Sequence, residues 1–314
     1  MDPSAGFMKI FNAAQTRQSL PYPALCDILA DTLQAHRAGR IVAPERMVVS
    51  IAAGGSLLLM PASDGEIAIT KLVTVHPENR NESLPAIQGE VIVMEAASGR
   101  RLGILDGITV TARRTAAVSA LAAGRLAPDP AGPLLIVGAG TQARAHVEAF
   151  SEVLGVRQLF IASRTRAKAE KLACLAQARG VRVKVIDCPE TVLKDVTLIV
   201  TATSSVSPVL GGVLRPDAFV AAVGAFTASM AELPVEWVRR GRLFADTLEG
   251  VRAEGGDFIQ AGIDWERVRP LEEAITKQRP DGGPVIFKSV GHAMFDLAAA
   301  RLAFDRGGFK SRSG

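Results

Sequence analysis

Residues 134–143 read LLIVGAGTQA, and this short stretch decides the fold. Its first four residues form an apolar run between Pro133 and Gly138, which is typical of a parallel strand buried on both faces. The next six are Gly138-Ala139-Gly140-Thr141-Gln142-Ala143, a GxGxxA pattern where the strand gives way to a helix. The first Gly permits a tight turn, the second lets backbone N–H groups approach a diphosphate, and the small Ala143 lets the helix pack closely on the strand. Such a pattern alone is weak evidence, but inside a βαβ unit it predicts a dinucleotide site at the positive end of the helix.

Downstream of this stretch, apolar runs alternate with helical patterns. The predicted strands cover residues 158–162, 181–186, 197–202, 219–223 and 243–245, which with 134–137 makes a set of about six. The predicted helices between them include 140–154 and 166–179, the latter closed by Gly180. Strands alternating with helices indicate an α/β fold with a doubly wound parallel sheet of the Rossmann type. We expect this domain to span residues 119–287.

The first 115 residues have a different pattern. Strand-like segments at 46–52, 56–60, 66–75 and 89–95 are separated by turn signals such as Ser63-Asp64-Gly65 and Ser98-Gly99. Short connections of this kind join antiparallel strands. We expect residues 1–118 to form a second α/β domain with mostly antiparallel strands, joined by a C-terminal helix within 288–314.

Composition excludes several classes of protein. The 314 residues are 48% hydrophobic and 22% charged, which is ordinary for a globular protein, and no stretch has the roughly 18 unbroken apolar residues of a membrane span. Basic residues are spread along the chain and aromatics are only 5%, so we expect no nucleic-acid partner. The first residues lack a signal-peptide pattern and three scattered cysteines contain no CxxC pair. We therefore expect a cytoplasmic protein without a bound metal.

The choice of cofactor is made at the end of the second strand of the dinucleotide domain. NAD sites place an Asp or Glu there to hold the ribose hydroxyls. This chain instead has Ser163-Arg164-Thr165-Arg166, followed by Lys168, and no carboxylate. A guanidinium binds a 2′-phosphate with charge-assisted hydrogen bonds, whereas a carboxylate repels it. The pattern favours NADPH, with NADH as the alternative.

Two further strand ends carry small and hydroxyl residues. Thr201, Ala202 and Thr203 lie at the carboxyl end of the fourth strand, and Val223 and Gly224 at that of the fifth. Open α/β sheets bind ligands at the carboxyl ends of their strands, so we expect these residues to border the ribose and the nicotinamide.

Three cations of the N-terminal half lie in apolar surroundings. Arg46 precedes an apolar strand, Lys71 lies inside ITKLVTVHPENR, and Arg114 lies in the small-residue helix that follows Thr111. Charges in apolar segments are costly unless they are paired, although any one of them can also reach the surface by its long stem. Converging, the three would form a pocket for a carboxylate.

The motifs KLVTVHPENR (71–80), LPAIQGEVIVMEAASGRRLGILDGITVTARRTAAVSALAA (84–123), LLIVGAGTQA and FKSVGHAMFDLAAA (287–300) resemble the ornithine cyclodeaminase/mu-crystallin family. The resemblance covers nearly the whole chain, from about residue 45 to 302. It implies a homodimer whose N-terminal domain supplies the substrate pocket and the dimer sheet, and NAD(P)-dependent chemistry on imines or amino acids. It also implies that Arg46, Lys71 and Arg114 hold the substrate carboxylate, and that Ser289 lies near the nicotinamide.

Two departures from the family pattern narrow the substrate. The cyclodeaminases resembled here carry an Asp after the fifth strand that contacts the substrate amine, and Phe226 stands at that position. They also carry a Glu shortly before the Met-Pro pair, which by spacing falls on Leu58. The absence of both the Asp and the Glu argues against a substrate with a free terminal ammonium, because neither residue is present to bind it. The family members that look like this reduce Δ1-pyrroline-2-carboxylate or Δ1-piperideine-2-carboxylate to L-proline or L-pipecolate.

The resulting hypothesis is NADPH-dependent reduction of a small cyclic imino acid, with Leu58 and Phe226 as an apolar wall around its ring. Lys71, or a water that it holds, is the candidate proton donor, with His76 and His292 as alternatives. Three other readings stay open: an ornithine cyclodeaminase or alanine-dehydrogenase-like enzyme, a non-catalytic NADPH-binding protein resembling mu-crystallin, and a purely structural dimer.

Overall fold

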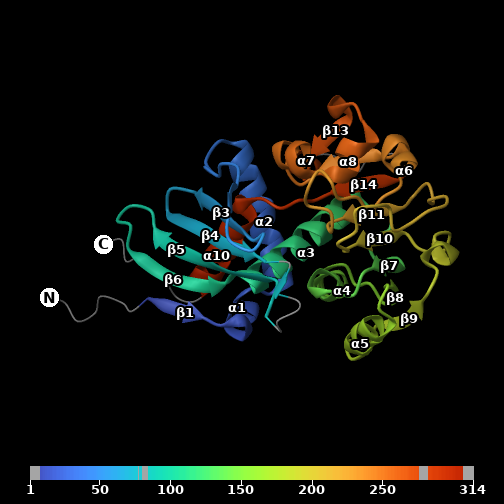
Figure 1. The fold of residues 1–314 in the computed structure, drawn as a ribbon, viewed down its shortest axis with the longest axis horizontal. Helices are drawn as coiled ribbons and strands as arrows, with labels where there is room; N and C mark the ends of the chain where they lie inside the picture. Colours follow the sequence, from blue (N-terminus) through green and yellow to red (C-terminus); the bar gives the residue numbers. More distant parts are fainter. Residues whose placement is uncertain (1–7, 77, 80–83, 276–281, 307–314) are drawn as a thin grey trace. The chain divides into compact units, whose positions relative to one another are not determined.

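The computed structural model describes residues 8–76, 78–79, 84–275 and 282–306. Its internal contacts divide the chain into two units, one of residues 1–114 with 292–314 and one of residues 115–291 (Figure 1). The division falls inside one helix, α3 (Gly107–Leu126), so this helix contributes to both units.

The unit of residues 115–291 is built on a parallel sheet whose described strands number eight. Their order across the sheet is β13 (Val268–Pro270), β12 (Arg242–Ala245), β14 (Val285–Lys288), β11 (Phe219–Ala222), β10 (Leu198–Thr201), β7 (Leu134–Val137), β8 (Gln158–Ala162) and β9 (Arg182–Ile186). Every neighbouring pair is parallel, which confirms the predicted doubly wound sheet.

The strand order reverses at β7. From β7 the chain continues to β8 and β9 on one side, and then crosses to β10 and β11 on the other. Such a switch point is where open α/β sheets leave a crevice at their carboxyl edge. The residues after β7, β8, β10 and β11 therefore share one edge of the sheet.

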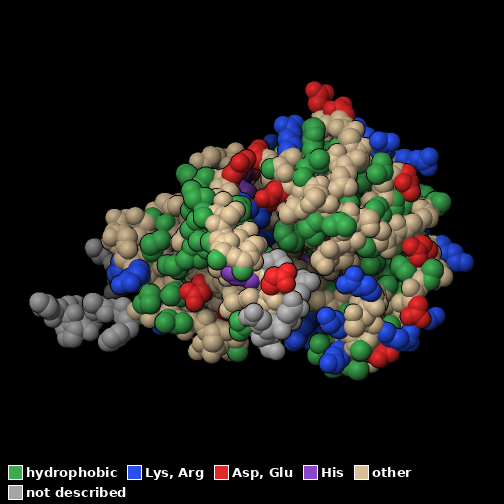
Figure 2. Space-filling view, in the orientation of Figure 1, with side chains coloured by type: hydrophobic (Ala, Val, Ile, Leu, Met, Phe, Trp, Pro, Cys, Tyr) green, Lys and Arg blue, Asp and Glu red, His purple; other side chains and the backbone are tan. Residues whose placement is uncertain are grey.

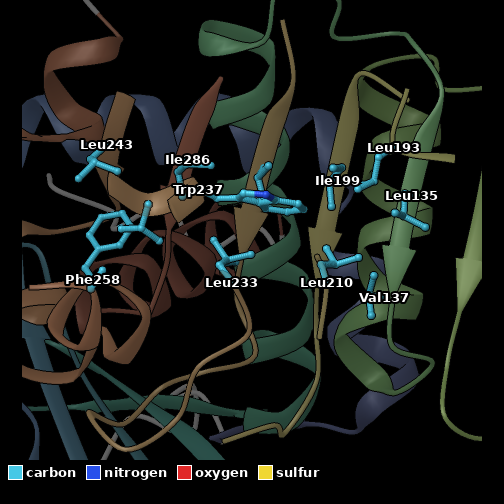
Figure 3. Close-up of a cluster of buried hydrophobic side chains, with 14 of the residues drawn as sticks. Leu135, Val137, Leu193, Ile199, Leu210, Leu233, Trp237, Leu243, Phe258 and Ile286 are labelled. Atoms are coloured by element: carbon cyan, nitrogen blue, oxygen red, sulfur yellow. The ribbon is translucent and has the colours of Figure 1, made fainter. Parts of the chain in front are cut away.

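Helices cover this sheet over an apolar core. They are α4 (Thr141–Val153), α5 (Arg166–Gln177), α6 (Val235–Arg240), α7 (Leu248–Glu254), α8 (Gly256–Ala261) and α9 (Leu271–Ala274), with short 3₁₀ turns η2 (Pro189–Val192) and η3 (Trp265–Arg267). Figure 3 shows part of the core, in which Trp237, Leu233 and Phe258 pack with side chains of the strands. The strands β7, β10, β11 and β14 are wholly buried, as expected where a sheet is covered on both faces.

The set of about six strands predicted for this sheet was incomplete. It lacked β13 and β14, and β14 lies between β11 and β12. These strands have three and four residues, which is too short for an apolar pattern to distinguish them from a connection.

The other unit contains a six-stranded sheet in the order β1 (Lys9–Phe11), β6 (Arg101–Asp106), β5 (Ile87–Glu95), β4 (Ile67–Val75), β3 (Ser56–Ser63) and β2 (Met47–Ser50). Strands β2 to β6 form antiparallel pairs, as the turn signals predicted, and β1 is parallel to β6. Neither β1 nor β6 was among the predicted strands.

One face of this sheet is covered by helices. The helices of the unit are α1 (Ala13–Ser19), α2 (Tyr22–Arg37) and α10 (Ala293–Arg306), and α10 packs on α2 and on β3 to β5. In β4 the side chains of Ile69, Lys71 and Val73 are buried while their neighbours are only half-buried. The alternation places these three on the helix-covered face. Within the described ranges, every helix is too short or too polar to cross a bilayer.

Candidate functional site

Lys71 is a buried cation at the centre of the antiparallel sheet. Its side chain points to the face covered by α10 because it lies in register with the buried Ile69 and Val73 on either side. Only 2% of Lys71 is exposed. Its ammonium Nζ forms an ion pair with Oδ2 of Asp296 at 2.7 Å, and it donates to Oγ1 of Thr111 at 3.5 Å.

Asp296 joins Lys71 to the second predicted cation. It lies in the first turn of α10 and is fully buried. Its other oxygen, Oδ1, accepts a hydrogen bond from Nε of Arg114 at 3.2 Å. Burial alone would raise the pKa of Asp296, but the charges of Lys71 and Arg114 hold that pKa below its ordinary value. The helix N-terminus also favours an anion in its first turn.

Arg46 completes the group of cations. Met47 pairs with Leu59 and Met60 pairs with Lys71, so alternation places the half-buried Arg46 on the Lys71 face of the sheet. It lies close enough that its charge acts on Lys71. Burial lowers the pKa of Lys71 to about 8, Asp296 opposes this shift, and Arg114 and Arg46 add to it.

Leu58 lies on the same face of the sheet as these cations. It pairs with the buried Val73, two residues along β4 from Lys71, and is itself half-buried. An apolar side chain therefore borders the charged group on this face.

We call Arg46, Lys71, Arg114 and Asp296 the cation cluster. Lys71 and Arg114 share the single carboxylate of Asp296, so these three groups together keep a net positive charge with Lys71 protonated. Within the described chain, Arg114 forms its ion pair with Asp296 through Nε. Its two terminal NH₂ groups can therefore donate hydrogen bonds to an incoming anion. The cluster can therefore bind a carboxylate and present an amine that exchanges a proton near neutral pH.

Asp296 was missed at the sequence level, although the quoted motif FKSVGHAMFDLAAA contains it. A signal was present, because it is the only acidic residue in the apolar run Ala293–Phe304. The same argument that singled out Lys71, a charge in an apolar segment, applies equally to its partner.

The GxGxxA stretch lies at the carboxyl end of β7, as predicted. Gly138 has φ +122°, and a Cβ there would lie 2.4 Å from the carbonyl oxygen of Ala202 after β10. Gly140 caps α4 without a side-chain hydrogen bond, and a Cβ on it would meet nothing within 4 Å. Open space therefore lies beside Gly140 at the N-terminus of α4, where backbone N–H groups favour a diphosphate.

The other residues of the GxGxxA stretch differ in how far they are buried. Ala143 is fully buried against the sheet, whereas Ala139 is half-buried and Thr141 is exposed. Gln142 has a buried Oε1 without a hydrogen-bond partner in the described chain. This unpartnered oxygen is an acceptor that a hydroxyl or N–H donor of a ligand would satisfy.

Of the residues predicted to read the 2′-position, Ser163, Arg164 and Thr165 follow β8, and Lys168 lies in the first turn of α5. The hydroxyl of Ser163 accepts from the N–H of Thr165, the residue that precedes α5, and Arg164 and Lys168 are exposed. Neither of these two cations has an ion pair within the described ranges. Arg166 differs, because it is paired with Asp187 at 2.8 Å and with Glu170 at 3.0 Å.

The residues after β10 and β11 are gathered by a carboxylate that sequence reasoning did not assign. Glu232 accepts hydrogen bonds from the hydroxyls of Thr201 and Thr203 and from the N–H groups of Thr203, Gly224 and Ala225. The hydroxyls of the two threonines are thus directed at Glu232. Val223 is buried and Ala202 is half-buried.

Ser289 is also held by a carboxylate. Its hydroxyl donates to Oδ2 of Asp246 at 2.8 Å, and the N–H groups of Val290 and Gly291 donate to the same oxygen. Asp246 follows β12 and is almost fully buried. It fixes the turn after β14 on which Ser289 lies.

The remaining candidates have simple surroundings. Phe226 is 42% exposed, which is unusual for a large apolar side chain. The ring of His76 packs beside Gly55, and that of His292 lies edge-on to His36 and Phe295. The polar contacts of Lys71 within the described chain are with Asp296 and Thr111, and with neither histidine.

The structure thus brings the predicted residues together in two groups. Arg46, Leu58, Lys71 and Arg114 belong to one unit, and the residues of the four strand ends with Ser289 belong to the other. Among the described residues, no group of three or more His, Cys, Asp or Glu side chains is arranged to hold a metal ion.

Comparison with known proteins gives consistent matches over nearly the whole chain. A Delta(1)-pyrroline-2-carboxylate reductase 1 from Burkholderia multivorans is 41% identical over 296 residues, 94% of this chain and 95% of that protein. A Delta(1)-pyrroline-2-carboxylate/Delta(1)-piperideine-2-carboxylate reductase from Azospirillum brasilense is 39% identical over 296 residues, again 94% and 95%.

A solved structure agrees with these matches. The Delta(1)-pyrroline-2-carboxylate reductase of Thermococcus litoralis, in complex with NADH and L-proline, superposes with a TM-score of 0.89 at 26% identity, covering 96% of this chain and 97% of that one. The model of the ornithine cyclodeaminase/mu-crystallin family matches residues 9–310. The resemblance found in the motifs is therefore confirmed, and the chain belongs to the ornithine cyclodeaminase/mu-crystallin family.

Proposed function

We propose that this protein reduces a cyclic imino acid, Δ1-pyrroline-2-carboxylate or Δ1-piperideine-2-carboxylate, to L-proline or L-pipecolate with NADPH. The observation that carries the proposal is the cation cluster, in which Lys71 and Arg114 are buried around Asp296 with Arg46 nearby. The relatives named as reductases of these imines support the choice of substrate.

Bound NADPH would supply a hydride to C2 of the imine and leave as NADP⁺. Arg46 and Arg114 would hold the substrate carboxylate, which fixes the face of the ring that meets the hydride. Lys71, whose pKa is lowered to about 8 by burial, would give its proton to the imine nitrogen and so complete the secondary amine. Orientation is a large part of such catalysis, since well-placed reactants gain about 7–11 kcal/mol.

Two cations, Arg164 before α5 and Lys168 in its first turn, support NADPH over NADH. Arg166 is committed to Asp187 and Glu170, whereas Arg164 and Lys168 have no ion pair in the described chain. They remain for a 2′-phosphate, which they would bind at the N-terminus of α5. The similar reductase of Thermococcus litoralis was solved with NADH, so both cofactors belong in the test.

The absence of an acidic residue at positions 58 and 226 supports an imine over ornithine. Leu58 lies on the same face of its sheet as Lys71. The aromatic ring of Phe226, on the loop after β11, is exposed to solvent. Neither stabilises a free terminal ammonium. They suit the methylene groups of a ring.

A homodimer is part of the same proposal. The sheet face opposite α10 carries apolar side chains that are only partly covered within the chain, among them Met47, Val49, Leu59, Leu72 and Ile92. Figure 2 shows hydrophobic side chains gathered over the region of β3 and β4. Apolar patches of this kind commonly pair with a second copy. A cytoplasmic location stays a prediction.

The test compares the two imines as substrates, each with NADPH and with NADH. The reaction is monitored through the loss of absorbance of the reduced cofactor. We expect imine-dependent oxidation of NADPH, faster than that of NADH. Tight NADPH binding without turnover would favour the non-catalytic binder instead. Release of ammonia from ornithine would favour a cyclodeaminase and would contradict the role given to Phe226.

A further inference from the structure

Glu232 is a buried carboxylate without a role in the proposed reduction. It is wholly shielded from solvent and lies on the connection that follows β11. Oε1 accepts from the N–H of Thr203 at 2.7 Å and from its hydroxyl at 2.8 Å. Oε2 accepts from the N–H of Gly224 at 2.7 Å, from that of Ala225 at 3.2 Å and from the hydroxyl of Thr201 at 3.1 Å. One side chain thus ties the loop after β10 to the loop after β11.

A second buried pair holds Glu232 in place. Oδ1 of Asp257 accepts from the N–H groups of Glu232 at 2.6 Å and Leu233 at 2.9 Å. Its other oxygen forms an ion pair at 2.8 Å with Nζ of Lys288, the last residue of β14, and both side chains are fully buried. The connection that carries Glu232 is therefore anchored to a third strand end, next to Ser289.

The arrangement leaves the two loops little freedom. A Cβ on Gly224 would lie 2.1 Å from the carbonyl oxygen of Thr203 and 2.4 Å from Oε1 of Glu232. Burying three charged groups costs free energy that apolar side chains of similar volume would not cost. In some proteins such costly buried charges are kept because they fix one arrangement of the chain.

We infer that Glu232 is a positioning residue of the proposed reduction, which holds the loops at 201–203 and 223–225 in the arrangement that aligns the nicotinamide with the imine. The inference rests on the proposed function. Its location supports it, because the loops lie at the carboxyl edge of β10 and β11, where doubly wound sheets bind their ligands. Glu232 would act through these loops, because it is wholly buried and its hydrogen bonds are to their backbone and hydroxyl groups.

Glu232→Gln is the informative variant, because either orientation of the amide turns an NH₂ group toward N–H or O–H donors. We expect the rate of hydride transfer, measured in a single turnover with Δ1-pyrroline-2-carboxylate, to fall about 10- to 100-fold, as misplacement of about 1 Å does. The KM of the imine and the dissociation constant of NADPH, followed by its fluorescence, should change less than about threefold, since their binding groups remain. The primary isotope effect with NADPH deuterated at C4 should increase.

Thr201→Val is a milder second variant that removes one donor and preserves the shape of the side chain. We expect a drop of the same kind, about three- to tenfold, again in the rate of hydride transfer. It keeps the test decisive if Glu232→Gln does not fold. Asp217→Asn serves as the matched control, because the half-buried Asp217 forms its ion pair within the described chain with Arg215, two residues away and outside the loops that Glu232 holds.

The outcomes separate the two proposals. A wild-type protein that oxidises no NADPH with either imine would overturn the proposed function, and this inference with it. An active wild-type protein with a Thr201→Val or Glu232→Gln variant of unchanged hydride-transfer rate would overturn this inference alone. Equal loss of NADPH binding and turnover would also overturn it, since Glu232 would then maintain the fold or the binding site rather than the alignment.

Discussion

The ammonium of Lys71 lies 2.7 Å from Oδ2 of Asp296, and both side chains are buried. Burial lowers the pKa of Lys71 to about 8, and the charge of Asp296 is what keeps that pKa from falling further. A proton donor with this pKa is charged below about pH 8 and loses its proton above it. We therefore expect kcat/KM for the imine to fall as the pH rises through about 8.

Asp296→Asn should move this basic limb to lower pH. The variant removes the anion that raises the pKa of Lys71 and leaves Arg114 and Arg46, which lower it. We expect the limb to shift by about one pH unit or more. The exposed Asp305→Asn on the same helix should leave the profile in place. An unchanged limb in the Asp296 variant would remove Lys71 as the titrating group.

Lys71→Met tests the proton donor directly. Met fills a similar volume in the buried site but has no proton to give and no charge for the carboxylate. We expect turnover of the imine to fall by about 10²- to 10⁴-fold while NADPH binding stays unchanged. Lys171→Met, on the exposed side of α5, is the matched control. Turnover within twofold of wild type would place Lys71 outside the site.

The sequence predicts the dinucleotide half of this protein well because its signals are local. LLIVGAGTQA lies on consecutive residues, and a strand, a turn and a helix follow from them. The cation cluster is different, since Lys71, Arg114 and Asp296 come from β4, α3 and α10. Only the family resemblance related the two cations, and nothing local related them to Asp296.

The partners of the buried carboxylate Glu232 are likewise distant in the sequence and could not be predicted from it. Glu232 is adjacent to no residue that it holds, and its donors lie 7 to 31 positions away along the chain. Three of its five donors are backbone N–H groups, which every sequence has and which therefore leave no signal. Such partners become apparent only when the ends of β10 and β11 are placed side by side.

Arg164→Ala should separate the two cofactors. Arg164 has no ion pair in the described chain, so its loss removes a contact to the 2′-phosphate rather than a structural one. We expect the KM of NADPH to rise about tenfold or more, which corresponds to one charge-assisted contact, with little change for NADH. Lys171→Ala, at an exposed position of α5, is the control. Equal effects on both cofactors would show that the 2′-phosphate is not bound there.

His146 makes stability depend on pH. It lies on α4, fully buried, with Nδ1 2.8 Å from the carbonyl oxygen of Gln142 and Nε2 2.9 Å from Oγ of Ser119. Burial lowers its pKa from 6.5 to about 4, so the folded protein holds it neutral while the unfolded chain takes up a proton below about 6.5. Stability is therefore lost as the pH falls from about 6.5 toward 4.

The expected loss is about 2 kcal/mol of the free energy of unfolding between about pH 7.5 and pH 5. Urea titrations at the two values would measure it. His146→Gln has no group that titrates in this range, so its stability should fall by less over the same interval. Parallel curves for the variant and the wild type would contradict this account of His146.

The open sheet face gives a prediction about assembly. Leu59 and Leu72 are cross-strand partners on the face opposite α10, where both are half-buried. If that face pairs with a second copy, a Leu59→Glu/Leu72→Glu variant would bury four carboxylates in each dimer, two from each copy. We expect sedimentation to report a dimer for the wild type and a weakened dimer, by about 100-fold or more in dissociation constant, for the variant. Val213→Glu is the control, because Val213 is an 87% exposed apolar residue of the other unit. Because the paired leucines contribute little to the core, the variant should keep its fold, which circular dichroism would check. If the variant forms a dimer of undiminished affinity, the chain associates through a different surface.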